Sequence, residues 1–351
     1  MYPGEYTLIG NELSFFTRKL EAQLRFQQVP WHYQFKTEAR REALEAKAGT
    51  HFIPLLSTPD RWLLQDTISI GPFLNERFSE TPVIPNTPLQ RALCFILEDA
   101  FNHWLGRVCV HSRWCYPENV EWVGPRFGAN IMLDRSIDLP FTNEELDQLS
   151  HLGPTMNQGF GQNACAVNGV GAEQAAAVQA DFREMLDVLS AHFAHNRFLL
   201  GGRPCLADFA LAGASKAHFI TDPEPKSWLK QHEATLMQYT EPFFSDEGLT
   251  AGSWSEDNAL PNTLSDVLDY FGRTYFVSSA ANIAAGLAGE KFYEYDIGHG
   301  VTRARTARRL NQARLHVKGE LNRCHDRGQR SSRYAGADRY LVLLHWLRTL
   351  V

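Results

Sequence analysis

The first 80 residues alternate between short apolar runs and longer amphipathic segments. The apolar runs predict strands at residues 6–9, 31–34, 51–57 and 60–64. The segments between and after them predict helices at residues 14–28, 37–48 and 66–77. This order predicts a small α/β unit. Its third strand contains Pro54, which cannot donate to a strand ladder and therefore needs a special role.

The pattern becomes helical after residues 79–88, where three prolines predict a linker. Helical spacing of apolar residues then predicts helices at 89–104, 172–196, 208–219 and 226–244. The glycine-rich segment 153–171 predicts a loop, and the polar segment 246–261 predicts a connection. Three further helices are expected at 262–287, 302–323 and 338–350. We therefore expect three parts, 1–80, 88–245 and 246–351.

Composition narrows the class of protein. The chain has 351 residues, of which 44% are hydrophobic and 21% are charged, as in folded globular proteins. It has no apolar run of about 18 residues, which argues against a membrane span. The net charge of −6 argues against non-specific binding of nucleic acid. Six cysteines without paired spacing favour reduced thiols and a cytoplasmic location: Cys94, Cys109, Cys115, Cys165, Cys205 and Cys324.

Four segments, taken in order, resemble the glutathione S-transferase family of bacterial type. They are Leu8–Lys19, Phe52–Leu56 (similar to the family's VPVL segment), Asp66–Leu74, and Gly201–Phe209 with its ADF motif. The resemblance covers about residues 5–245 and leaves the rest as an extension. It implies an α+β fold, with a thioredoxin-like N-terminal domain, an all-α C-terminal domain and a helical extension. It also implies homodimerisation, which is an expectation here.

The resemblance implies where glutathione, the co-substrate, would bind. A cis bond between Ile53 and Pro54 would turn the Ile53 backbone toward the cysteinyl backbone of glutathione, as in strand addition. Asp66 and Thr67 begin a helix and would hold the γ-glutamyl end; capping of that helix is compatible with this role. Lys36 is the candidate for the glycyl carboxylate, with a solvated surface position as the alternative.

The resemblance implies that Ser14 would stabilise the glutathione thiolate as a hydrogen-bond donor, and that Asn11 would be a second donor. A free thiol has a pKa of about 8.5, so its thiolate needs a hydrogen-bond donor and the positive end of a helix at neutral pH. Ser14 stands where the family carries Ser or Cys before the first helix, although a simple N-cap is the alternative. The turn contains no cysteine, which disfavours a mixed-disulfide mechanism and favours conjugation or thiolytic cleavage.

The expected function is attack of the glutathione thiolate on an electrophile. Residues 103–114 combine His, Arg and Trp and would suit an aromatic or acidic substrate, unless they serve helix packing. One alternative is a binding or structural protein that keeps the fold without turnover. Another is a reductase that uses a cysteine from elsewhere in the chain.

Other polar groups favour structural roles. Cys205 and Asp208 predict a helix-capping box. His192 and His195 share a helix face but have no third ligand nearby, so we expect no metal. Residues 301–335 hold ten basic residues against two acidic ones, and this excess favours a solvated face paired with acidic surface.

Overall fold

The computed structural model describes residues 4–257, 259–307 and 317–319. Its N-terminal part is a sheet with strand order β2-β1-β3-β4. The strands are β1 (Tyr6–Gly10), β2 (Trp31–Phe35), β3 (Leu55–Ser57) and β4 (Leu63–Gln65). β1 and β2 are parallel, while β3 is antiparallel to both of its neighbours. The associated helices are α1 (Phe15–Phe26), α2 (Glu38–Ala48) and α3 (Thr67–Arg77).

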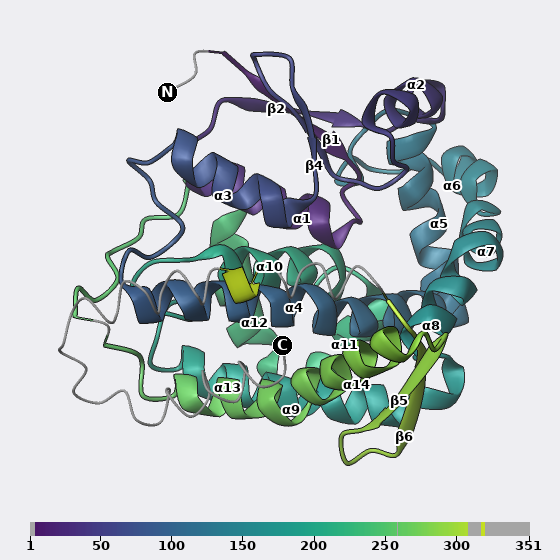
Figure 1. Ribbon diagram of the computed structural model, residues 1–351. Helices are drawn as coiled ribbons and strands as arrows, with labels where there is room; N and C mark the ends of the chain where they lie inside the picture. The colour runs from purple at the N-terminus through teal and green to yellow at the C-terminus, as the bar shows by residue number, and fades with distance from the viewer. Residues whose placement is uncertain (1–3, 258, 308–316, 320–351) are drawn as a thin grey trace.

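This mixed sheet confirms the predicted thioredoxin-like unit. Helices α1 and α3 lie between the sheet and the long helix α4 (Pro88–Trp114) (Figure 1). They pack on the sheet through apolar residues such as Leu8 of β1, Leu20 and Leu24 of α1, and Leu74 of α3. Strand β3 begins only after Pro54, because a residue without an N–H cannot donate to the ladder.

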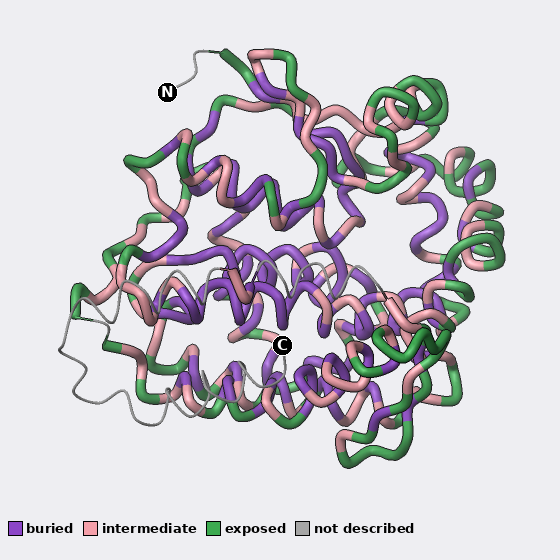
Figure 2. The backbone as a smooth tube through the Cα atoms, viewed as in Figure 1, coloured by how far each residue is buried: buried purple, intermediate pink, exposed green. Residues whose placement is uncertain are grey.

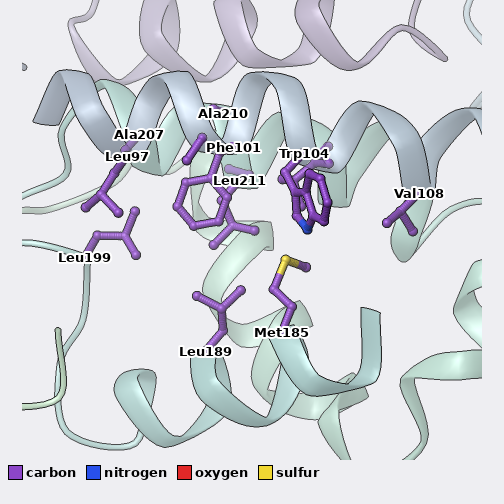
Figure 3. Packing of buried hydrophobic residues seen from close by; sticks show 14 of the residues in the cluster. Leu97, Phe101, Trp104, Val108, Met185, Leu189, Leu199, Ala207, Ala210 and Leu211 are labelled. Atoms are coloured by element: carbon purple, nitrogen blue, oxygen red, sulfur yellow. The ribbon is translucent and has the colours of Figure 1, made fainter. Parts of the chain in front are cut away.

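The helical part is built around α4 (Pro88–Trp114), which is buried along most of its length (Figure 2). Leu97, Phe101 and Trp104 of α4 pack against Met185 and Leu189 (Figure 3). The helices around α4 are α5 (Pro117–Ile131), α6 (Asn143–Leu149), α9 (Ala175–Phe193), α10 (Leu206–Ala214), α11 (Pro223–Leu229) and α12 (Glu233–Thr240). Short helical turns η2–η5 extend them at Ala172–Gln174, Ser215–Phe219, Lys230–His232 and Glu241–Phe243. The predicted all-α second unit is therefore present, although α5 and α6 were not predicted.

The expected loop at 153–171 is wrong. This segment forms α7 (Leu152–Met156), the π-helical η1 (Asn157–Gly161) and α8 (Gln162–Asn168). Its glycines allow close packing rather than a flexible turn: a Cβ at Gly153 would overlap the carbonyl oxygen of Val120 in α5. At Gly161, a Cβ would collide with the ring of Trp114.

The extension is only partly helical within the described residues. The expected helix 262–287 is two helices, α13 (Leu264–Arg273) and α14 (Tyr275–Ala288), separated by the non-helical backbone of Thr274. The expected helix from residue 302 is wrong at its start, because β6 (Val301–Arg305) pairs with β5 (Phe292–Asp296) in a hairpin. Buried and exposed positions alternate along β6, a period-two pattern typical of a strand. Residues 308–316 and 320–323 of that predicted helix, and the whole of the helix predicted at 338–350, lie outside the described residues.

The hairpin turn follows from local chemistry. The Asp296 side chain accepts hydrogen bonds from the backbone N–H groups of Gly298 and Gly300. Both glycines have positive φ, a conformation that other residues rarely adopt. Across the described residues, none of the helices is both long and apolar enough to cross a bilayer.

Candidate functional site

Strand register brings the predicted site segments to one edge of the sheet. Ile9 of β1 is opposite Leu55 of β3, and Leu55 is opposite Gln65 of β4. The turn after β1, the residues before β3 and the residues after β4 therefore meet there. The end of β2 joins the same edge, since the Lys36 N–H donates to the Gly10 carbonyl. All seven predicted site residues belong to these four segments.

The turn between β1 and α1 places Ser14 at the N-terminus of α1. Ser14 is the N-cap, and its Oγ accepts from the Thr17 N–H at 3.4 Å. Accepting this bond leaves the hydroxyl hydrogen available for another acceptor. Asn11 is buried, and its Oδ1 accepts from the Leu13 N–H at 2.9 Å, so its amide nitrogen is the group that can donate outward.

The helical domain holds this turn in place. The buried Glu12 carboxylate accepts from Asn130 Nδ2 at 2.9 Å, from Ser136 Oγ at 2.8 Å and from the Ile137 N–H at 2.8 Å. On the other side, Arg113 Nη1 of α4 donates to the Leu13 carbonyl at 2.5 Å. The position of the turn therefore depends on contacts from a second domain, which no short motif in the sequence indicates.

The peptide bond between Ile53 and Pro54 is cis, which confirms that prediction. Ladder pairing of β3 begins at Leu55, so the half-buried Ile53 precedes the paired strand. Lys36 lies nearby and donates from Nζ to Glu45 Oε1 and to the His51 carbonyl, both at 2.7 Å. This ion pair lowers the pKa of Glu45. Lys36 thus supports the loop before the cis bond, and its contact with a glycyl carboxylate stays a prediction.

Asp66 and Thr67 form the start of α3. Asp66 has φ of 72°, in the left-handed region where Asp is tolerated at a cost, and its carboxylate accepts from the Ile68 N–H at 3.0 Å. The Asp66 side chain is exposed, whereas Thr67 is buried. Strained backbone of this kind often accompanies a functional site, because the surrounding structure must hold it.

A buried lysine determines how the Thr67 hydroxyl can be used. Lys19 Nζ of α1 donates to Thr67 Oγ1 at 3.3 Å, to Glu98 Oε1 at 2.6 Å and to Asn102 Oδ1 at 3.0 Å. Because an ammonium can only donate, Thr67 accepts from Lys19 and keeps its own hydroxyl hydrogen for an external acceptor. No pattern in the sequence indicates this role of Lys19.

The basic and aromatic residues at 103–114 make internal contacts. Arg113 pairs with Asp222 at 2.8 Å, and Arg107 lies over the Trp104 ring with Asp181 at 3.6 Å. His111 is fully buried. These contacts support the helix-packing interpretation of the segment over the substrate-binding one.

The predicted capping box at the start of α10 is confirmed. The Cys205 N–H donates to Asp208 Oδ2 at 2.9 Å. The Leu199 N–H and the Tyr239 hydroxyl both donate to Asp208 Oδ1 at 2.9 Å. Burial nevertheless raises the pKa of Asp208 to about 6. This carboxylate joins α10, α12 and the loop before α10, which is a folding role.

Comparison with known proteins identifies part of the helical domain. Residues 172–214, which span η2, α9 and α10, match the family model described as glutathione S-transferase, C-terminal domain. No curated protein matches the sequence.

Similar solved structures cover most of the chain at low identity. A glutathione S-transferase from Rhodospirillum rubrum F11 is 16% identical, with a TM-score of 0.44, covering 75% of this chain and 99% of its own. FzlA from C. crescentus is 18% identical, with a TM-score of 0.41 and coverage of 75% and 99%. A glutathione S-transferase from Methylobacterium radiotolerans JCM 2831, in complex with glutathione sulfonate, is 14% identical, with a TM-score of 0.40 and coverage of 73% and 100%. Residues 172–214, which follow the thioredoxin-like sheet and α4 along the chain, are therefore similar to the C-terminal domain of glutathione S-transferases.

Proposed function

We propose that this chain binds glutathione at the sheet edge and uses the glutathione thiolate to attack an electrophile. The observation that carries the proposal is the convergence of four segments at that edge, one of which contains the cis Ile53–Pro54 bond. Three of these segments offer groups that suit different parts of the tripeptide.

Binding would use the groups at the start of β3 and α3. The backbone of Ile53 would pair with the cysteinyl backbone of glutathione, in the manner of an added strand. The Thr67 hydroxyl, which accepts from Lys19, would donate to the γ-glutamyl carboxylate. The exposed Asp66 carboxylate would accept from the γ-glutamyl ammonium.

Chemistry would use the turn before α1. The Ser14 hydroxyl and the N-terminus of α1 would stabilise the thiolate, and the Asn11 amide would serve as a second donor. The thiolate would form a carbon–sulfur bond with the electrophile, whose leaving group would depart with the electron pair. This reaction needs no cysteine in the turn, and residues 11–14 contain none.

The test is the ultraviolet absorbance of the glutathione thiolate, titrated with pH in the presence of the protein. Bound glutathione should ionise with a midpoint below about 8, whereas the free thiol has a pKa of about 8.5. Ser14→Ala should return the midpoint toward the free value, and Ser69→Ala, an exposed serine of α3, should leave it unchanged. A bound thiol whose midpoint equals that of the free thiol would refute catalysis and favour a binding protein without turnover.

A further inference from the structure

Two thiols face each other at the C-terminal end of α4. Cys115 is the C-cap residue of α4, and Cys165 belongs to α8, which lies beside that end of α4 (Figure 1). Their Sγ atoms are 3.7 Å apart and the two cysteines are not bonded to each other. A shift of less than 2 Å would therefore bring the sulfurs to the disulfide length of about 2 Å.

The surroundings of Cys115 favour its thiolate. His111, one helical turn earlier, directs Nδ1 at the Val170 carbonyl at 2.8 Å, so this nitrogen carries a hydrogen. The groups around the Cys115 thiol are Cys165 of α8, His111 of α4, Glu173 of η2 and the Val170 carbonyl, to which Cys115 Sγ donates at 3.5 Å. The contact with Cys165 lowers the pKa of Cys115, and His111 lowers it further, whereas partial burial and Glu173 raise it; the net direction is downward. The neighbouring Cys115 and burial raise the pKa of Cys165.

Exposure separates this pair from the other described cysteines. Cys115 is half-buried and can meet a small reagent, whereas Cys165 is 4% exposed and lies behind it. Cys94 and Cys205 also interact, but both are completely buried, and burial raises the pKa of Cys205. Burial likewise raises the pKa of Cys109. Only at Cys115, among these five, do access and a favoured thiolate coincide.

We propose that Cys115 and Cys165 form a redox-active pair that a low-molecular-weight disulfide oxidises to an intramolecular disulfide. The Cys115 thiolate attacks one sulfur of the small disulfide, forming a mixed disulfide and releasing one thiolate. Cys165 then loses its proton and attacks Cys115 Sγ, which releases the second thiolate. Two electrons pass from the protein dithiol to the reagent, which leaves as two thiols.

The resulting disulfide would join the C-terminal end of α4 to α8. Among the described cysteines, Cys165 is the one that lies in α8. The proposal does not depend on glutathione-transferase activity, because it concerns thiols outside the sheet edge. It assigns chemistry to cysteines that the proposed function leaves unused.

The experiment uses the full chain carrying Cys324→Ser, so that only the five described cysteines can react. The reduced protein is incubated with glutathione disulfide at neutral pH, and free thiols are then blocked with iodoacetamide. Mass spectrometry of the intact protein and of its peptides follows. We expect a peptide pair linked through Cys115 and Cys165 that has lost two hydrogen atoms and carries no carbamidomethyl group on either cysteine. Dithiothreitol should reverse this change.

Two variants identify the order of the steps. Cys165→Ser should trap a glutathione adduct on Cys115, whereas Cys115→Ser should give neither an adduct nor a disulfide. Cys109→Ala, on the same helix, should behave like the parent protein. The proposal fails if the parent protein keeps both thiols free, if it stops at a mixed disulfide, or if the linked pair is a different one. Peptide mapping of the parent decides this even if a variant does not fold.

Discussion

Replacement of Arg113 by methionine tests whether the two domains jointly hold the candidate site. The Arg113 side chain is 4% exposed, and Nε and Nη2 donate to the two Asp222 oxygens at 2.8 and 3.0 Å. Its other bonds reach the carbonyls of Leu13, at 2.5 Å, and Ala217, at 2.6 Å. Methionine has similar length but no donor. The variant would leave the fully buried Asp222 carboxylate without its guanidinium and the Leu13 carbonyl without its donor.

The expected cost is large because Asp222 cannot reach water. Removing one partner of a buried ion pair costs about 3–5 kcal/mol. With a urea m value of about 3 kcal/mol per M, the unfolding midpoint should fall by about 1–1.7 M. The measurement is urea unfolding followed by circular dichroism. Lys216→Met is the control, because its ion pair with Glu241 is partly exposed and should cost less than about 1 kcal/mol.

A double variant separates the charge effect from the positioning effect. Asp222→Asn in the Arg113→Met background neutralises the buried carboxylate and should recover at least about half of the lost stability. It does not restore the bond to Leu13, so thiolate stabilisation at the adjacent Ser14 should stay impaired. If Arg113→Met lowered the free energy of unfolding by less than about 1 kcal/mol, or if the double variant recovered none of the loss, Arg113 would not be needed to compensate the buried Asp222 charge.

Three further changes should have distinct effects. Asp208→Asn should flatten the pH dependence of the free energy of unfolding. Burial raises the pKa of Asp208 to about 6. The contribution of Asp208 to stability is therefore fully present below its unfolded pKa and is lost as the pH rises through about 6. Urea titrations of wild type and variant between about pH 4 and 7 measure this difference, and parallel curves would contradict it. Gly153→Ala should cost about 1–3 kcal/mol in urea unfolding, because its Cβ would overlap the Val120 carbonyl; an unchanged midpoint would show that α7 can move away from α5. Glu12→Ala should lower the free energy of unfolding by about 1–3 kcal/mol, because Asn130, Ser136 and Ile137 lose the buried carboxylate to which they donate. An unchanged free energy of unfolding would show that these bonds do not hold the turn against the helical domain.

The pattern of neighbouring residues predicted correctly those elements whose structure depends on local hydrogen bonds. Ser14 caps α1 as its position suggested, and Cys205 with Asp208 forms the predicted box. Errors arose where packing determined the outcome. The glycines of 153–171 indicate a loop when taken alone, yet Gly153 permits two helices to approach closely. In β6 the apolar signal is weak, because the buried residues are Thr302 and Ala304, whereas Val301, Arg303 and Arg305 are exposed.

The site was predictable where it depends on short motifs and not where it depends on distant residues. The segments around Asn11–Ser14, Ile53–Pro54 and Asp66–Thr67 are each local. By contrast, the Glu12 bond with Asn130 and the Lys19 bond with Glu98 join residues that are 118 and 79 positions apart. Nothing in their spacing could reveal these pairs, because the contacts exist only after the two domains pack.

Calorimetric titration of the protein with reduced glutathione is the most direct test of whether glutathione binds at this sheet edge. We expect a dissociation constant in the micromolar to low-millimolar range for the wild type. Thr67→Val, which keeps the shape but removes the hydroxyl, should weaken binding by about tenfold or more, the equivalent of one hydrogen bond to a charged group. Ser69→Ala should bind like the wild type. Absence of binding to the folded wild-type protein, or unaltered binding by Thr67→Val, would contradict the assignment of this sheet edge to glutathione.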